Sequence, residues 1–285
     1  MEAQTASQTA VLTAMLRAAH QLVDDEPKIV NDPIAIALVD DITRERIAAR
    51  PAALCSPGLM IPRAAVLLRG RYAEDLLARA VTHGVGQFVI LGAGLDTFAF
   101  RQPAFADHLQ IYEVDYPTTQ AWKRERLAAA GVAVPKNLHW APIDFEQQSL
   151  SAGLQDAGVD ASRSAFFSWL GVTQYLTLPA IDATLKAVAA FPSPSTIVLS
   201  FMLPDLDLPA EEAAAARAAA ENAARTGEAW LTRLRPSELA ARFTKLGFRK
   251  VVHLTPKEAN ARYFTGRRDG LRAPHVAQIM TATNT

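Results

Sequence analysis

Five short apolar runs in the middle of the chain alternate with segments that favour helix. The runs cover residues 88–91, 111–114, 138–143, 165–169 and 196–201. Between them, residues 118–130 and 178–190 are rich in strong helix formers. Strands that alternate with helices predict a parallel sheet with right-handed crossovers. Ligands of such sheets bind beyond the C-terminal ends of the strands, so the polar residues that follow each run are the candidates for a site.

The segments on either side of these runs are mostly helical in pattern. Before the runs, apolar residues recur at helical spacing over 10–20, and a long amphipathic segment covers 61–82. Between them, Asp32 is a suitable N-cap for a helix that starts at Pro33. After the runs, an alanine-rich helix is predicted over 209–226. A helix from Ser237 to a stop at Gly247 and a final strand through Val252 complete the pattern.

These elements predict one α/β domain over residues 1–285, with a Rossmann-like, mostly parallel sheet. We expect a helical cover over 1–58, a cofactor-binding core over 59–205, and a helical insertion with a C-terminal strand region over 206–285. No internal repeat and no flexible linker divides the chain.

The composition is that of a folded, soluble protein. Half of the residues are hydrophobic, and the 29 basic side chains balance the 29 acidic ones. We therefore expect no nucleic-acid partner. The start of the chain lacks a secretion signal and no apolar run approaches the ~20 residues that cross a bilayer, which predicts a cytoplasmic protein without a membrane partner. The six histidines are scattered and Cys55 is alone, so we expect no metal site.

The stretch FVILGAGLDTFAFR, residues 88–101, carries the first candidate site. The first apolar run stops at Gly92, Ala93 and Gly94, where a glycine turn brings backbone close to a ligand and a following helix would point its N–H groups inward. A dinucleotide fingerprint would need a third glycine, but Thr97 occupies that position. Asp115 closes the second run about 20 residues later, where nucleotide-binding sheets place an acid for the ribose hydroxyls.

The third and fourth runs end in further candidates. Asp144 follows the third run and can accept a hydrogen bond from an adenine amino group, while Phe145 packs on the ring. An acid at this point is typical of adenosylmethionine sites, and an NAD site does not require one. Trp169, Thr173 and Tyr175 are candidates for the wall near a transferred methyl group.

The chain resembles the leucine carboxyl methyltransferase family, and within it a bacterial branch of proposed S-adenosyl-L-methionine-dependent methyltransferases. RGRYAEDL, QFVILGAGLDTFAFR, YEVDYP, PIDF and FFSWLGVTQYLT carry the resemblance, with NDPIA and RPSELAARFTKLGF near the two ends. The resemblance implies a class I methyltransferase fold with an N-terminal helical cover.

The resemblance also implies the residues that hold the cofactor. Arg69 takes the place of the arginine that binds the cofactor carboxylate, and Arg71 is the alternative; a guanidinium fork suits a carboxylate. Gly92, Asp115, Asp144 and Phe145 match the glycine, the ribose acid and the adenine-side pair. Leu170 stands where eukaryotic members carry a glutamate that contacts the cofactor, so the protein substrate of those members cannot be transferred to this chain.

The leading hypothesis is an adenosylmethionine-dependent O-methyltransferase for a small-molecule or peptidic acceptor. A carboxylate acceptor needs no general base, which agrees with the lack of an obvious His–Asp pair. A hydroxyl acceptor would need one, with Tyr175 or His20 as candidates. Arg17 is a candidate anchor for an anionic acceptor. Asp96 is a further cofactor candidate, or it ties the glycine loop to its helix together with Arg101.

Two alternatives remain open. The glycine loop and Asp115 alone would also suit an NAD(P)-dependent oxidoreductase. A non-catalytic module that binds an adenine nucleotide and docks a partner on the alanine-rich helix is the other alternative.

Overall fold

The computed structural model describes residues 7–144 and 147–284. The strands are β1 (Gln87–Leu91), β2 (Gln110–Asp115), β3 (Leu138–Pro142), β4 (Phe166–Trp169), β5 (Thr196–Met202), β6 (Lys250–Leu254) and β7 (Ala277–Thr283). The α-helices are α1 (Gln8–Val23), α2 (Pro33–Leu38), α3 (Asp41–Ala49), α4 (Pro57–Thr82), α5 (Phe98–Arg101), α6 (Pro117–Ala129), α7 (Leu150–Asp156), α8 (Leu178–Ala189), α9 (Ala210–Arg225), α10 (Pro236–Lys245) and α11 (Pro256–Ala259).

The strands form one seven-stranded sheet in the order β3-β2-β1-β4-β5-β7-β6. β1 to β5 are parallel, and β7 is antiparallel to both of its neighbours. β1 has β2 on one side and β4 on the other, so the direction of strand addition reverses between β1 and β4. This reversal is a topological switch point, the usual place for a ligand in such a sheet.

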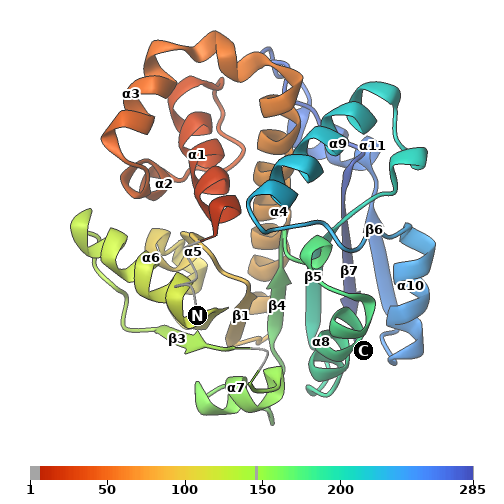
Figure 1. Cartoon of the computed structure of the whole chain (residues 1–285). Helices are drawn as coiled ribbons and strands as arrows, with labels where there is room; N and C mark the ends of the chain where they lie inside the picture. Colours follow the sequence, from red (N-terminus) through yellow and green to blue (C-terminus); the bar gives the residue numbers. More distant parts are fainter. Residues whose placement is uncertain (1–6, 145–146, 285) are drawn as a thin grey trace.

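Helices cover both faces of the sheet (Figure 1). On one face, α4 contributes Leu67 and Leu77 to a core that also contains Phe88 and Ile111. On the other face, α8 and α10 pack against a second core that includes Phe167. The predicted class I methyltransferase architecture, a mostly parallel α/β sheet with added helices, is confirmed.

The predicted five parallel strands are all present, within two residues at each end. The expectation that the strand through Val252 is the final one is wrong, because β7 follows it and lies between β5 and β6. The residue limits predicted for the cover, core and insertion stay a prediction. Among the described residues we find no helix with the length and apolarity that a bilayer-spanning segment needs.

The N-terminal helices α1, α2 and α3 pack together beyond one end of the sheet, and α9 lies beside α4 (Figure 1). The buried Asp32 carboxylate joins this cover to the core. As predicted, Asp32 caps α2, because its Oδ1 accepts a hydrogen bond from the Ala35 N–H at 3.1 Å. Its Oδ2 accepts from the Thr97 hydroxyl at 2.7 Å and lies 3.2 Å from Arg17 Nε. One carboxylate thereby holds α1, α2 and the loop before α5 together.

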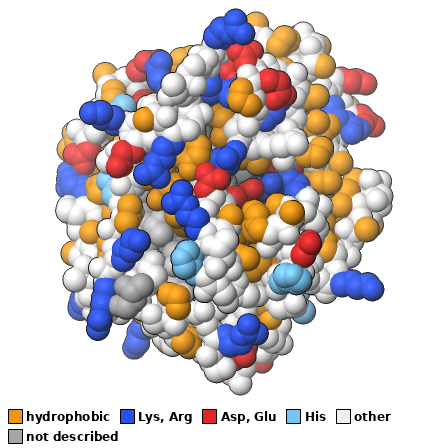
Figure 2. Space-filling model, turned by 180° about the vertical axis from the view of Figure 1, so that it is seen from behind, with side chains coloured by type: hydrophobic (Ala, Val, Ile, Leu, Met, Phe, Trp, Pro, Cys, Tyr) orange, Lys and Arg blue, Asp and Glu red, His pale blue; other side chains and the backbone are white. Residues whose placement is uncertain are grey.

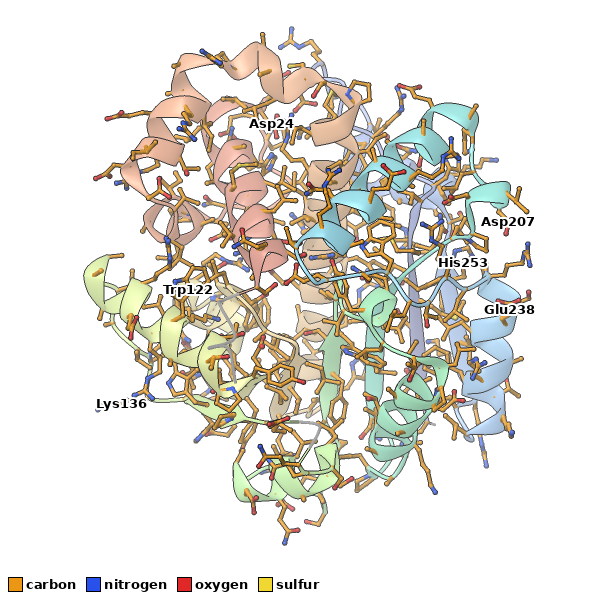
Figure 3. The ribbon with its side chains drawn as sticks, viewed as in Figure 1. Asp24, Trp122, Lys136, Asp207, Glu238 and His253 are labelled. Atoms are coloured by element: carbon orange, nitrogen blue, oxygen red, sulfur yellow. The ribbon has the colours of Figure 1, made fainter. Side chains whose placement is uncertain are left out.

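Basic and acidic side chains are interspersed over the rear face of the molecule, which Figure 2 shows. Seen from the front, Asp24 lies between the upper part of α1 and α4, and Trp122 projects from α6 below the cover (Figure 3).

Candidate functional site

The C-terminal ends of β1 and β4 lie side by side at the switch point, and each leads into a glycine turn. Gly92 and Gly94 follow β1 with φ of 69° and 50°, and Gly171 follows β4 with φ of 77°. These left-handed conformations are the reason for glycine at all three positions. Gly92 is exposed and the other two are half-buried. Backbone is therefore accessible at the place where the topology favours a ligand.

The glycine loop is fixed to the end of β2 by its own N–H groups. The N–H groups of Gly92 and Ala93 both donate to the Val114 carbonyl, at 2.8 and 3.0 Å. The Gly94 N–H donates to Asp115 Oδ2 at 2.5 Å. The loop therefore places the predicted glycine and ribose residues in direct contact with one another.

The helix expected after the glycine loop is present as the short helix α5. α5 starts at Phe98, whose N–H donates to Asp96 Oδ1 at 2.8 Å. That the N–H groups of this helix point at a ligand stays a prediction, although one of them, the Phe98 N–H, already donates to Asp96. The second interpretation of Asp96, as a residue that ties the loop to its helix, agrees with this bond. Thr97, which stands where a third glycine would be, donates a hydrogen bond from its hydroxyl to Asp32.

The Asp115 carboxylate is half-buried at the end of β2. Besides Gly94, the Tyr116 N–H donates to it, to Oδ1 at 2.7 Å. Burial raises the pKa of Asp115, and the two backbone N–H groups oppose that rise. A carboxylate has about four lone-pair sites, so it can accept further bonds from two ribose hydroxyls.

Arg69 reaches the same place from α4. Its guanidinium lies against Gly171, where an added Cβ would be 2.2 Å from Nη1. Within the described residues, the Arg69 side chain makes no hydrogen bond or ion pair. Burial lowers the pKa of Arg69 to about 10, and the nearby Tyr175 and Asp96 partly oppose this. A half-buried, charged guanidinium without a protein partner fits an external anion such as a carboxylate.

Arg71, the alternative to Arg69, has different neighbours. Its Nε pairs with Asp75 at 2.8 Å and its Nη1 donates to the Ile29 carbonyl at 3.1 Å. It lines a cavity of about 770 Å³ together with Tyr263. The structure therefore favours Arg69 over Arg71 for the site at the strand ends.

Of the two residues predicted beside the adenine, only Asp144 is among the described residues. Asp144 follows β3 and is half-buried, and Gln147 Nε2 donates to its Oδ2 at 2.8 Å. Phe145 lies outside the described residues.

The residues at and after the end of β4 have different roles. Trp169 is 2% exposed and belongs to the core on the α8 face. The Thr173 hydroxyl donates to the Ser200 carbonyl at 2.8 Å. Leu170 is half-buried against the opposite core. These contacts favour a packing role for Trp169 and Thr173, whereas Tyr175 extends towards α1.

Arg17 and His20 on α1 are both engaged by the protein. Arg17 donates to the Leu95 carbonyl and pairs with Asp32, and its side chain is 12% exposed. His20 is fully buried, with Nδ1 2.8 Å from Asp24 Oδ2. Its Nε2 accepts from the Ile29 N–H at 2.9 Å. These bonds favour structural roles, as a loop anchor for Arg17 and a core residue for His20.

Two residues that the sequence did not indicate join Tyr175. The Tyr175 hydroxyl donates to Thr9 Oγ1 at 3.2 Å, and the Thr9 hydroxyl in turn donates to the Glu228 carboxylate. Thr9 belongs to the first turn of α1, and Glu228 lies three residues beyond α9. No local pattern marks either residue, because the contact joins positions 219 apart in the chain.

Comparison with known proteins shows the family and the fold of the chain. The leucine carboxyl methyltransferase family model matches residues 10–189. A Bacillus subtilis (strain 168) protein named "Putative S-adenosyl-L-methionine-dependent methyltransferase YktD" is 30% identical over 294 residues, which cover 96% of each chain. A crystal structure of a duf574 family protein from Streptomyces avermitilis MA-4680 is 16% identical, covers 95% of this chain and 97% of its own, and has a TM-score of 0.57. That last similarity concerns the fold alone.

The mostly parallel seven-stranded sheet, taken with the family match and the curated relative, identifies the chain as a class I methyltransferase that uses S-adenosyl-L-methionine. Within that class, the chain belongs to the leucine carboxyl methyltransferase family.

Proposed function

We propose that this enzyme is an O-methyltransferase that methylates a carboxylate or hydroxyl group of a small-molecule or peptidic acceptor. The observation that carries the proposal is the pairing of two side chains at one switch point. Arg69 presents a guanidinium that the described chain leaves without a partner, and Asp115 presents a half-buried carboxylate. The Arg69 guanidinium suits the carboxylate of S-adenosyl-L-methionine, and the Asp115 carboxylate suits its ribose hydroxyls.

The remaining cofactor contacts would come from the loops beside these two residues. Gly92, Ala93 and Gly94 would border the aminocarboxypropyl arm, because their N–H groups face β2 and leave the other side of the turn to a ligand. Asp144, with Phe145, would border the adenine. Leu170 is apolar, so any ionic contact to the cofactor ammonium must come from another residue.

S-adenosyl-L-methionine, when bound, supplies an electrophilic methyl group on a sulfonium sulfur. The task of the protein is to hold the acceptor oxygen in line with that methyl group and to exclude water, and positioning of this kind supplies most of the acceleration. The cover of α1 to α3, joined to the glycine loop through Asp32, would exclude water from above the strand ends.

Ligand-dependent thermal melting tests the cofactor assignment. We expect adenosylmethionine and adenosylhomocysteine to raise the melting temperature, because a ligand that binds only the folded state stabilises it. NAD should have no effect. Stabilisation by NAD alone would instead support an oxidoreductase.

Labelling tests the transfer itself. The protein is incubated with methyl-labelled adenosylmethionine and an extract of cells that lack it, and the labelled product is identified by mass spectrometry. Tight cofactor binding without any labelled product would support the non-catalytic module.

A further inference from the structure

Three segments that are far apart in the sequence meet beside Arg69 through one directed chain of hydrogen bonds. Tyr175 ends the 3₁₀ helix η3 (Thr173–Tyr175), which follows β4, and its hydroxyl donates to Thr9 on α1. The Thr9 hydroxyl donates to Glu228 Oε2, which also accepts from the Thr9 N–H at 3.0 Å. The chain therefore runs from a phenol at the candidate site to a carboxylate.

The carboxylate end of this chain is held in place by backbone. The Glu228 N–H donates to the Ala223 carbonyl at the end of α9, at 2.8 Å. Three residues further on, the Leu231 N–H donates to the Gln174 carbonyl at 2.7 Å, next to Tyr175. The segment after α9 is thus fixed beside η3, and all three side chains of the relay are half-buried.

Tyr175 is also close to the charged groups of the proposed cofactor site. η3 begins two residues after Gly171, against which the Arg69 guanidinium lies, so Tyr175 follows directly on the segment that Arg69 contacts. A proton that leaves an acceptor at this place would therefore have a nearby oxygen to move to.

The acceptor determines whether such a proton exists. Methylation of a carboxylate consumes an anion and releases no proton. Methylation of a hydroxyl forms an O–C bond while the C–S bond of the cofactor breaks, with the electron pair going to sulfur, and one proton must leave the oxygen. A proton relay that ends on a carboxylate is therefore needed only for methylation of a hydroxyl group.

We propose that the acceptor is a hydroxyl group and that its proton leaves through Tyr175 and Thr9 to Glu228. The Tyr175 oxygen receives the acceptor proton as its own proton passes to Thr9 Oγ1, and the Thr9 proton passes to the Glu228 carboxylate. The inference rests on the proposed function and narrows its acceptor. Glu228 acts through two other residues, so it is a positioning residue and proton sink.

The experiment uses Glu228→Gln, because a glutamine oxygen can still accept both Thr9 bonds but cannot take up a proton near neutral pH. Glu221→Gln is the matched control, since Glu221 is an exposed acid on α9. Thr9→Val removes the middle of the relay, and Thr9→Ser restores a hydroxyl there. Each variant is assayed with methyl-labelled adenosylmethionine and cell extract, and calorimetry measures its affinity for adenosylhomocysteine.

Alkali separates the two acceptor classes, because methyl esters release their label as methanol and methyl ethers retain it. We expect alkali-stable label on oxygen, and a rate at pH 7 that falls about a hundredfold in Glu228→Gln and Thr9→Val. Glu221→Gln and Thr9→Ser should retain most of the rate. The affinity for adenosylhomocysteine should stay within about twofold in all four variants, and the Glu228→Gln rate should recover as the pH rises and the acceptor ionises by itself.

Other outcomes would overturn the inference. Alkali-labile label, label on nitrogen, or an unchanged rate in Glu228→Gln would each remove the need for a proton path. A loss of rate that does not recover at high pH, with weaker affinity for adenosylhomocysteine, would mean that Glu228 only pins α1 in place. Failure of the wild-type protein to label any acceptor would refute the proposed function itself.

Discussion

Replacement of Gly171 by alanine is the sharpest test of how the site holds the cofactor. Gly171 has φ of 77°, and an added Cβ would lie 2.2 Å from Arg69 Nη1 and 2.6 Å from Cζ. Carbon–nitrogen contacts are comfortable only at about 3.5 Å or more, so the guanidinium must move by about 1.3 Å. The end of a long side chain can make that movement at little cost in stability, but it leaves the position from which it would bind a carboxylate.

Two separate magnitudes follow for Gly171→Ala. Alanine at a left-handed position costs about 1–2 kcal/mol of folding free energy. A charge-assisted hydrogen bond contributes about 1.5–3 kcal/mol, so loss of the Arg69 contact should weaken cofactor binding about ten- to a hundredfold. The loss of folding free energy is expected at any left-handed glycine. The loss of cofactor affinity, in contrast, depends on Arg69.

Gly131→Ala is the control, because Gly131 has φ of 67° and nothing within 4 Å of an added Cβ. Calorimetry with adenosylhomocysteine and urea unfolding are measured for both variants. We expect similar losses of stability and a loss of affinity only in Gly171→Ala. In an Arg69→Met background, Gly171→Ala should have no further effect on binding. Equal affinity in the two alanine variants would refute the role of Arg69.

Three further expectations concern single carboxylates. Asp115→Ala should weaken adenosylhomocysteine binding at least tenfold, about 1.4 kcal/mol, in calorimetry; unchanged affinity would exclude the ribose contact. Burial raises the pKa of Glu113 to about 7, against the opposing effect of the buried Lys123 ammonium that pairs with it at 2.5 Å. Because this pKa lies above the unfolded value, the folded state binds more protons than the unfolded chain between about pH 4 and 7. The stability that this carboxyl contributes is therefore present at about pH 4 and lost as the pH rises to 7. Urea midpoints across this range should fall more steeply for the wild type than for Glu113→Gln, and parallel profiles would contradict this. Asp32→Ala leaves the buried side of Arg17 unpaired and should cost about 3–5 kcal/mol in urea unfolding; a loss below about 1 kcal/mol would show that the cover is held by other contacts.

The sequence predicts the parallel part of the fold because that part is locally encoded. Each of β1 to β5 is a compact apolar run between helix-forming segments, so pattern alone locates it. The apolar pattern does not locate β7, because residues 277–283 contain only two large apolar side chains, Ile279 and Met280. Its burial comes from two neighbouring strands, and even Gln278 and Thr281 are buried there.

The candidate site is predictable where it follows from strand order. Gly92 and Asp115 end adjacent parallel strands, so their proximity follows from topology. Residues that reach the site from distant segments of the chain are not marked by strand order. The contact between Arg69 and Gly171 depends on how α4 packs against the end of β4. The contact between Thr9 and Glu228 depends on how α1 packs beside the segment after α9. Trp169 illustrates the converse, because its position at the end of the apolar run suggested the site, whereas its side chain belongs to the core.

The position of β7 has a consequence for the order in which the sheet can form. Within the described residues, β6 pairs only with β7, and β7 also completes the edge of β5. During synthesis β6 leaves the ribosome before the strand that must lie between it and the rest of the sheet. Until residues 277–283 emerge, β5 presents an open edge and β6 has nothing to join. This half of the sheet therefore closes by a long-range pairing step, and the nascent chain exposes an unpaired edge that could capture another strand until that step is complete.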